Sequence, residues 1–97
     1  MKQVLIGRSA QADIIVDSEI KTVSAKHATV EWDGVQYKLH DHSANGSYVN
    51  GEKIHNDTCV IRKGDVVTLS RKYTLDLNAV FALLAYNATK PEETESV

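Results

Sequence analysis

Turn signals recur along this chain at intervals that leave little room for long helices. They are Gly7-Arg8, Asp33-Gly34, Asn45-Gly46, Asn50-Gly51 and Gly64-Asp65. The runs between them are short and either apolar or alternating, which is typical of β-strands. This rhythm predicts an all-β fold, a β-sandwich of two packed and mostly antiparallel sheets.

The predicted strands are KQVLI, DIIV, HATVEW, VQYKLHD, SYV, CVI, VVTLS and YTLDL. The next segment, NAVFALLAY at residues 78–86, is ambiguous. Its alternating apolar residues favour a strand, whereas its Ala and Leu content and Asn78 as a possible N-cap favour a short helix. We take the strand as the preferred interpretation.

Length and composition predict one domain over residues 1–86 followed by a tail. A chain of 97 residues can bury a core without disulfides or metals. After residue 86 the sequence becomes polar and acidic and contains the only proline. Residues 87–97 are therefore predicted to be a flexible tail or the start of a linker.

Charge and apolar content exclude several kinds of partner. The chain has 11 Lys and Arg against 13 Asp and Glu, whereas proteins that bind nucleic acid through phosphates normally carry a basic excess. It shows no signal peptide and no apolar run of bilayer length. The single Cys59 cannot form an internal disulfide. We expect a cytoplasmic, monomeric protein without direct contact to membrane or nucleic acid.

The Asp33-Gly34 pair predicts a β-hairpin with a two-residue turn. In that register the apolar pairs are Trp32 with Val35, Val30 with Tyr37, and Ala28 with Leu39. Because side chains alternate along a strand, all six lie on one face and the polar residues between them lie on the other.

The same register brings two polar loops together at one end of the hairpin. It places Ser24 near Ser43 and Thr22 near Asn45, although about twenty residues separate the two loops in sequence. Converging loops on a rigid scaffold commonly carry binding residues. This end is the predicted functional site.

The segment around Asp41 contains residue types that can bind metals. His40 and His42 point to the same side of a strand and Asp41 to the other, so the three cannot close on one ion. His27 lies opposite His40 in the predicted register, but histidines that are solvated or hydrogen-bonded are far commoner than metal ligands. No metal and no cofactor is predicted.

A Ser-His-Asp arrangement could also be assembled from Ser43, His27 and Asp41. The chain lacks a nucleophile elbow of the GxSxG type and any phosphate-binding glycine loop. No catalytic residue is predicted and the protein is not expected to be an enzyme. An enzyme or metal protein that uses this cluster is the competing class.

Three motifs occur in a set order: Gly7-Arg8, SAKH from Ser24 to His27, and DHSANGSYVNG from Asp41 to Gly51. In this order and spacing the chain resembles the forkhead-associated (FHA) domain family over roughly residues 1–77. The resemblance implies a β-sandwich of about eleven strands. It also implies a non-enzymatic signalling module that binds phosphothreonine peptides through loops at one end.

The resemblance also implies a role for each matching residue. Arg8 would bind the phosphate through its planar fork, and Ser24 would contribute its hydroxyl and backbone N–H. Asn45 would bind the main chain of the peptide. Gly7, His27, Gly46 and Ser47 would support the site.

Three further loop residues complete the predicted contact set: Ala25, Lys26 and Ala44. Ala25 and Ala44 stand where several family members place polar or basic side chains, and Lys26 could restore part of that charge. The alternative function is therefore an FHA-type scaffold that binds partners without phosphate. In the tail, phosphorylation of Thr89 or Thr94 would create a tethered ligand for this or a neighbouring domain.

Overall fold

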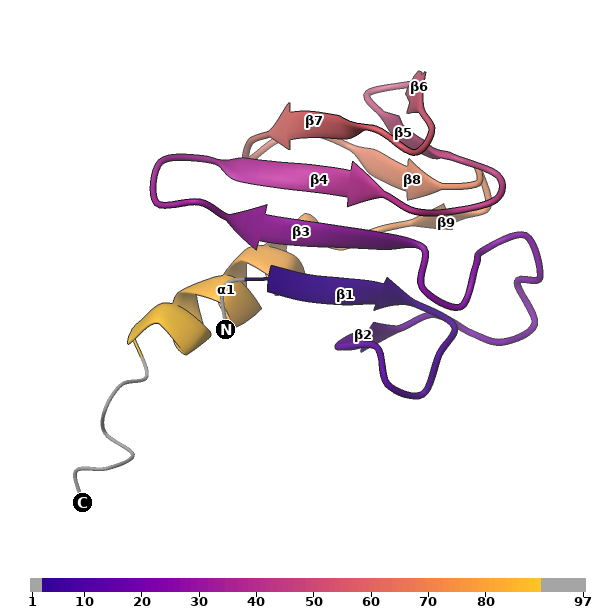
Figure 1. Cartoon of the computed structure of the whole chain (residues 1–97), viewed down its shortest axis with the longest axis horizontal. Helices are drawn as coiled ribbons and strands as arrows, with labels where there is room; N and C mark the ends of the chain where they lie inside the picture. Colours follow the sequence, from indigo (N-terminus) through magenta and orange to yellow (C-terminus); the bar gives the residue numbers. More distant parts are fainter. Residues whose placement is uncertain (1–2, 90–97) are drawn as a thin grey trace.

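A computed structural model of the chain describes the backbone of residues 3–89 and the side chains of residues 3–85 (Figure 1). This part contains nine strands and one helix. They are β1 (Gln3–Gly7), β2 (Ile14–Ile15), β3 (Ala28–Trp32), β4 (Tyr37–Asp41), β5 (Ser47–Val49), β6 (Glu52–Ile54), β7 (Thr58–Ile61), β8 (Val67–Leu69), β9 (Tyr73–Thr74) and α1 (Leu77–Thr89).

The strands form two sheets, as predicted. One has the order β2-β1-β3-β4-β7 and the other the order β6-β5-β8-β9. Every pairing is antiparallel except that of β1 with β2. The prediction of an all-β sandwich is confirmed, with nine strands in the described residues where the resemblance implied about eleven.

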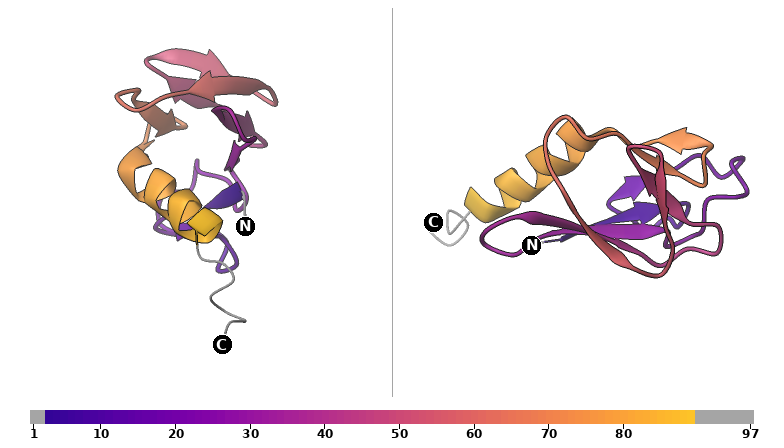
Figure 2. Two further views of the ribbon diagram at one scale, coloured as in Figure 1. Left: turned by 90° about the vertical axis from the view of Figure 1, so that its left-hand side faces the viewer. Right: turned by 90° about the horizontal axis from the view of Figure 1, so that it is seen from above.

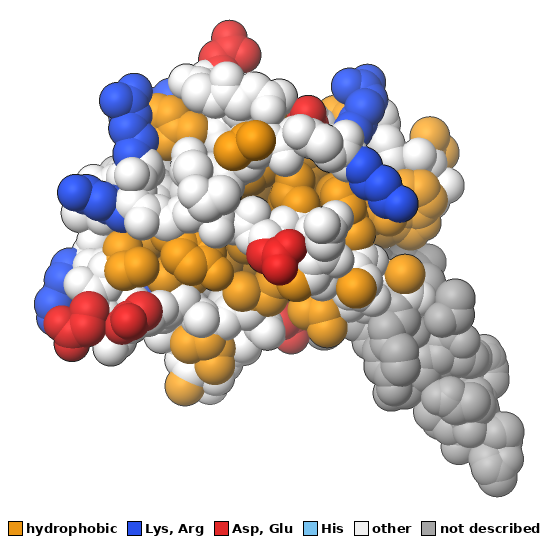
Figure 3. All heavy atoms as spheres, turned by 180° about the vertical axis from the view of Figure 1, so that it is seen from behind, with side chains coloured by type: hydrophobic (Ala, Val, Ile, Leu, Met, Phe, Trp, Pro, Cys, Tyr) orange, Lys and Arg blue, Asp and Glu red, His pale blue; other side chains and the backbone are white. Residues whose placement is uncertain are grey.

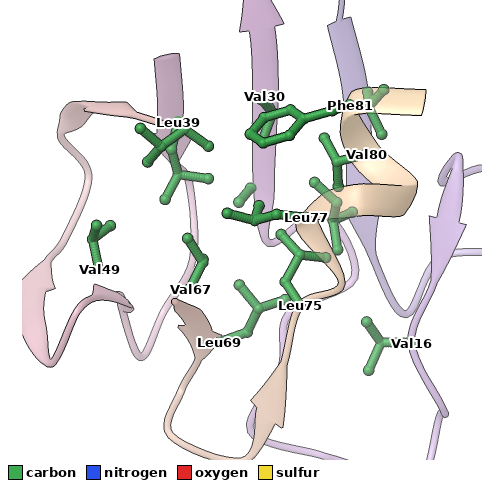
Figure 4. Close-up of a cluster of buried hydrophobic side chains, with 14 of the residues drawn as sticks. Val16, Val30, Leu39, Val49, Val67, Leu69, Leu75, Leu77, Val80 and Phe81 are labelled. Carbon is green, nitrogen blue, oxygen red and sulfur yellow. The ribbon is translucent and has the colours of Figure 1, made fainter. Parts of the chain in front are cut away.

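The core lies between the sheets because strands such as β1, β3 and β8 place apolar residues inward at alternate positions. Val4 and Val30 come from the larger sheet and Val67 and Leu69 from the smaller, and all four are fully buried. Figure 4 shows several of these side chains converging with residues of α1. Burying such side chains is the main stabilising contribution to a fold of this size.

The predicted hairpin register was wrong by two residues. Trp32 pairs with Tyr37 rather than with Val35, because the connection spans residues 33–36. The carboxylate of Asp33 accepts the backbone N–H of Val35 and of Gln36, which stabilises this longer turn. A shift of two residues leaves each side chain on its predicted face. Val35, however, is 81% exposed instead of paired in the strand.

The strand predicted at residues 78–86 was also wrong, because this segment belongs to α1. Leu77, Val80, Phe81 and Leu84 are buried at the i, i+3, i+4, i+7 spacing of one helix face. Ala79, one of the alternating apolar residues that favoured a strand, is exposed. The local alternation was therefore weaker evidence than the helical spacing.

The helix begins after Asp76, whose carboxylate accepts the N–H groups of Asn78 and Ala79. Asp76, and not the predicted Asn78, is thus the N-cap. Helix α1 packs against β1 and β3 and covers sheet surface that the smaller sheet leaves open (Figure 2).

The Asn50-Gly51 turn is confirmed: its φ angles are 53° and 88°, and Val49 pairs with Glu52 across it. This turn leads into β6, whose sequence EKI has no alternating apolar pattern and was not predicted as a strand.

Helix α1 extends through Thr89, so the first three residues of the predicted tail are helical. Residues 90–97, which make up the rest of the predicted tail and include Thr94, lie outside the described residues. The one helix of residues 3–89 is too short to cross a membrane.

Candidate functional site

Four connections meet at the end of the sandwich shown on the right of Figure 1. They are the segment after β1, the segment before β3, the β4–β5 loop and the β8–β9 loop. The backbone N–H of Arg8 donates to Ser24 O at 3.1 Å, and that of Ser70 donates to Gly46 O at 3.0 Å. Segments far apart in sequence thus form one hydrogen-bonded surface, which we call the loop platform.

Gly7 allows the first two segments to approach closely. A Cβ atom on Gly7 would lie 2.1 Å from the carbonyl oxygen of Ala25, which no side chain can tolerate. The next residues continue the contact, since Ser9 N–H donates to Ala25 O at 3.0 Å. Gly7 therefore places Arg8 directly beside the loop that contains Ser24.

Arg8 is half-buried and its Nε–H donates to Val23 O. Among the residues that the structure describes, its side chain makes no other hydrogen bond and no ion pair. Because a guanidinium has five N–H donors, four remain for a ligand. The contact with Val23 orients this fork in advance.

Ser24 links the two loops that carry the predicted site. Its hydroxyl oxygen accepts the N–H of Ala44 at 3.1 Å, which leaves the hydroxyl hydrogen for a ligand. Its own backbone N–H, which the family resemblance assigns to the phosphate, donates to Nδ1 of His27 at 3.0 Å. Ser24 can thus offer its side chain, while its backbone donor already has a partner.

Asn45 is exposed and lies against the other loop, as the hairpin count predicted. Its Nδ2 donates to Thr22 O at 2.8 Å. Its side-chain carbonyl and second N–H have no partner among the described residues, so both can bind an extended peptide. The remaining predicted contact residues, Ala25, Lys26 and Ala44, are exposed in the same two loops.

His27 is fully buried and connects the loops from below. Because Nδ1 accepts from Ser24, the ring proton is on Nε2, which donates to Gly46 O at 2.9 Å. Burial lowers the pKa of His27, and this outweighs the opposite effects of the Gly46 carbonyl and the Asp41 carboxylate 3.8 Å away. The ring is therefore a neutral structural link.

Asp41 is the centre of a second buried network beneath the loops. Its carboxylate accepts the hydroxyls of Ser43 at 2.8 Å and Ser47 at 2.6 Å, and the N–H of Asn56 at 2.9 Å. Burial raises the pKa of Asp41, but these hydrogen bonds together outweigh it and lower that pKa. Ser47 belongs to the smaller sheet and Asp41 to the larger, so the network joins both sheets.

Gly46 completes the support below the loops. Its N–H donates to the hydroxyl of Ser43 at 2.7 Å, and its φ of 90° favours glycine. All four predicted support residues therefore lie where the loops meet. Asp41 and Ser43 were missed as support, although their place in the DHSANGS motif was visible in the sequence.

The catalytic interpretation of Ser43, His27 and Asp41 has no support in the geometry. His27 binds Ser24 and Gly46 rather than Ser43, and the Ser43 hydroxyl donates to Asp41. All three side chains are buried.

His40 in β4 and His42 just after β4 likewise have separate partners. His40 bonds to Glu31 and Thr58, whereas His42 bonds to Thr29. Within the described part of the chain no group of three or more metal-ligating residues occurs.

The β8–β9 loop at the same end was not predicted as part of the site. The hydroxyls of Thr22 and Ser70 lie 2.8 Å apart, and the Arg71 guanidinium lies 4.6 Å from the centre of the Tyr48 ring. Ser70 and Arg71 have φ angles of 53° and 63° without a glycine, so the sequence contained no turn signal here.

This fold and site define a class of protein: a β-sandwich domain that displays an arginine, a serine and an asparagine on cross-linked loops at one end. The family model described as the FHA domain matches residues 4–70. The chain belongs to the FHA domain family.

Solved structures agree with this assignment. The FHA domain of FhaA, solved with the intracellular domain of another protein, is 30% identical, with a TM-score of 0.63 over 71% of this chain and 72% of that one. EmbR from Mycobacterium tuberculosis, solved with a low-affinity phosphopeptide, is 30% identical with a TM-score of 0.68 over 75% of this chain and 18% of that one.

The N-terminal FHA domain of Rad53p from S. cerevisiae, solved with a phosphothreonine peptide, is 28% identical. It aligns with a TM-score of 0.62 over 68% of this chain and 54% of that chain. A search of curated proteins finds no match.

Proposed function

We propose that this domain binds phosphothreonine-containing peptides or proteins through the loop platform. The observation that carries the proposal is Arg8, whose Nε–H is held by Val23 while the rest of its fork has no partner in the described chain. A fixed guanidinium with free donors suits a phosphate dianion. Related domains solved with phosphothreonine peptides support the same conclusion.

In this proposal Arg8 and the Ser24 hydroxyl bind the phosphate, and Lys26 adds charge from the loop tip. Asn45 holds the peptide main chain, with Ala25 and Ala44 beside it. Gly7, His27, Gly46 and Ser47 hold the loops in place through the contacts described above. No cofactor and no catalytic step are required.

Such a module acts in signalling, where a kinase creates its ligand and a phosphatase removes it. We place it in the cytoplasm as a monomeric domain over about residues 1–86, followed by residues that form a tail or the start of a linker. Its partner is a phosphorylated protein rather than nucleic acid or membrane.

The test is calorimetric titration with one peptide in phosphothreonine, phosphoserine and unphosphorylated forms. We expect binding to require phosphate. We also expect phosphothreonine to be preferred by a few-fold, because burying one methyl group contributes about 0.8 kcal/mol. Equal affinity for phosphothreonine and phosphoserine would contradict an apolar niche beside the phosphate.

The second candidate is a scaffold that does not need phosphate. Two observations favour it: Ala25 and Ala44 offer no polar side chain, and the Ser24 N–H is already bound by His27. Equal binding of the unphosphorylated peptide in the same titration would establish this alternative.

A further inference from the structure

A groove lies at the opposite end of the sandwich from the loop platform. Its walls come from the β3–β4 hairpin and from the end of β7 and the residues after it, and its volume is about 300 Å³. It is lined by Trp32, Val35, Gln36, Tyr37, Val60, Ile61, Arg62 and Lys63. We call it the hairpin-end groove.

The hairpin-end groove combines an apolar surface with two cations. Figure 3 shows hydrophobic side chains gathered at this end of the molecule, with Lys and Arg side chains beside them. Val35 is 81% exposed there. Neither Arg62 nor Lys63 forms an ion pair with any residue in the described range, whereas Lys38 nearby is paired with Asp33 at 3.2 Å. A suitable occupant carries both acidic and apolar side chains.

The chain itself contains such a segment immediately after α1. Residues 90–97 read KPEETESV, with three glutamates, a proline and a valine. Opposite charge and proximity in the chain both make this segment, rather than an unrelated peptide, the occupant to expect.

The end of α1 lies at the same end of the molecule as the β3–β4 hairpin (Figures 1 and 2). The Phe81 ring contacts Tyr37, a wall of the groove, with ring centres 4.2 Å apart. From Phe81 to Thr89 the helix rises about 12 Å. The next eight residues, when extended, can span up to about 26 Å. Residues 90–97 can therefore reach back to the groove.

We propose that residues 90–97 bind in the hairpin-end groove, with their glutamates paired to Arg62 and Lys63 and their apolar side chains over the aromatic wall. The short connection to α1 gives the segment an effective concentration in the millimolar range, so weak contacts are sufficient. Ion pairs this exposed are screened by salt, so occupancy decreases as ionic strength rises.

Trp32 is the only tryptophan of the chain and lines the groove, so its fluorescence reports on the occupant. The test measures acrylamide quenching of Trp32 in the full chain at low salt. We expect Glu92→Gln with Glu93→Gln and Glu95→Gln to increase the quenching constant. At about 1 M salt, where the Debye length is about 3 Å, this difference from the parent should disappear.

Reversing the cations, by Arg62→Glu with Lys63→Glu, should increase quenching in the same way. Adding Glu92→Lys, Glu93→Lys and Glu95→Lys to that variant should restore the parent value. The matched control is Arg71→Glu with Lys72→Glu, an identical pair of changes in the β8–β9 loop at the other end. This control should leave the quenching of Trp32 unchanged.

Backbone amide NMR spectra of the parent and of the variant with the three Glu→Gln changes (the glutamine variant) locate the contact. Shifts centred on residues 32–37 and 60–63 support the proposal, whereas shifts confined to the loop platform overturn it. Equal quenching of the parent and the glutamine variant at low salt would also overturn it. Because the glutamine changes lie outside the described fold, this result holds even if the Arg62 and Lys63 variant fails to fold.

Discussion

In the proposed function, Arg8 is held ready for the phosphate by its neighbours. The absence of a side chain on Gly7 lets the strand end touch the Ala25 carbonyl, and Val23 then holds the Nε–H of Arg8. Holding a long side chain in advance reduces the conformational entropy lost on binding. The same contact means that Arg8 also contributes to the fold, beyond what a surface arginine would.

The residue-scale prediction is that Arg8→Ala abolishes phosphopeptide binding at a small cost in stability. Loss of one member of a desolvated charge pair costs about 2–5 kcal/mol in binding. Loss of the Val23 hydrogen bond costs about 0.5–1.5 kcal/mol in unfolding free energy. Calorimetry and urea denaturation measure the two effects separately.

Arg8→Lys is the control, since it keeps the charge but loses the planar fork. It should recover only part of the affinity. If Arg8→Ala retained full affinity for the phosphopeptide, the phosphate site would have to lie elsewhere on the domain.

At the scale of elements, α1 completes the core of the larger sheet. Phe81 is 6% exposed, and its ring contacts the tilted ring of Tyr37 with centres 4.2 Å apart; the Tyr37 ring in turn lies 4.8 Å from that of Trp32. This aromatic row joins the helix to the β3–β4 hairpin. The helix is therefore an integral part of the domain rather than an appendage to the sandwich.

We predict that Phe81→Ala lowers the unfolding free energy by about 3–5 kcal/mol, because it removes a buried ring and leaves a cavity. Ala82→Gln, on the exposed side of the same helix, should change it by less than about 0.5 kcal/mol. Urea denaturation of both variants provides the comparison. Similar small losses for the two would mean that α1 does not stabilise the sandwich.

At the scale of the whole molecule, buried polar groups fix the arrangement of the two sheets and their loops, because hydrogen bonds are directional and apolar contacts are not. Asp41 binds Ser47 across the sheets, and His27 binds the carbonyl of Gly46. In the described side chains, every buried nitrogen and oxygen atom has a hydrogen-bond partner. Such satisfied networks favour one arrangement over looser alternatives.

Protonation of His27 and Asp41 should make the fold sensitive to acid. The pKa of His27 is lowered in the fold, so below about pH 6.5 the unfolded chain binds a proton that the folded chain excludes. Stability is then complete above that pH and decreases as pH falls through the folded pKa. The pKa of Asp41 is also lowered, so its contribution is present above about pH 3.9 and is lost below it.

Urea denaturation between about pH 7.5 and pH 5 tests the histidine effect, since most carboxylates stay ionised in that range. We expect the unfolding free energy to decrease, and His27→Gln to reduce the slope. An NMR titration of the His27 ring that gave a pKa above 6.5 would contradict the explanation.

What the sequence by itself determined follows from local rules. Period-two alternation placed Val30 and Leu39 on the core face, and the Asn50-Gly51 pair set its turn, because both depend only on near neighbours. The Gly7-Arg8, SAKH and DHSANGS motifs carried the family resemblance, and the structure brings all three together at one end of the sandwich.

Only the tertiary structure decided the rest. Where a local sequence pattern fits two different structures, contacts between residues far apart in the chain select one of them. Residues 77–84 fit both a strand and a helix by pattern, and packing against β1 and β3 selected the helix. Two hairpin registers put the same faces inward, and the Asp33 hydrogen bonds selected one. The contact of Thr22 with Ser70 joins residues 48 positions apart, a separation that no local sequence rule spans.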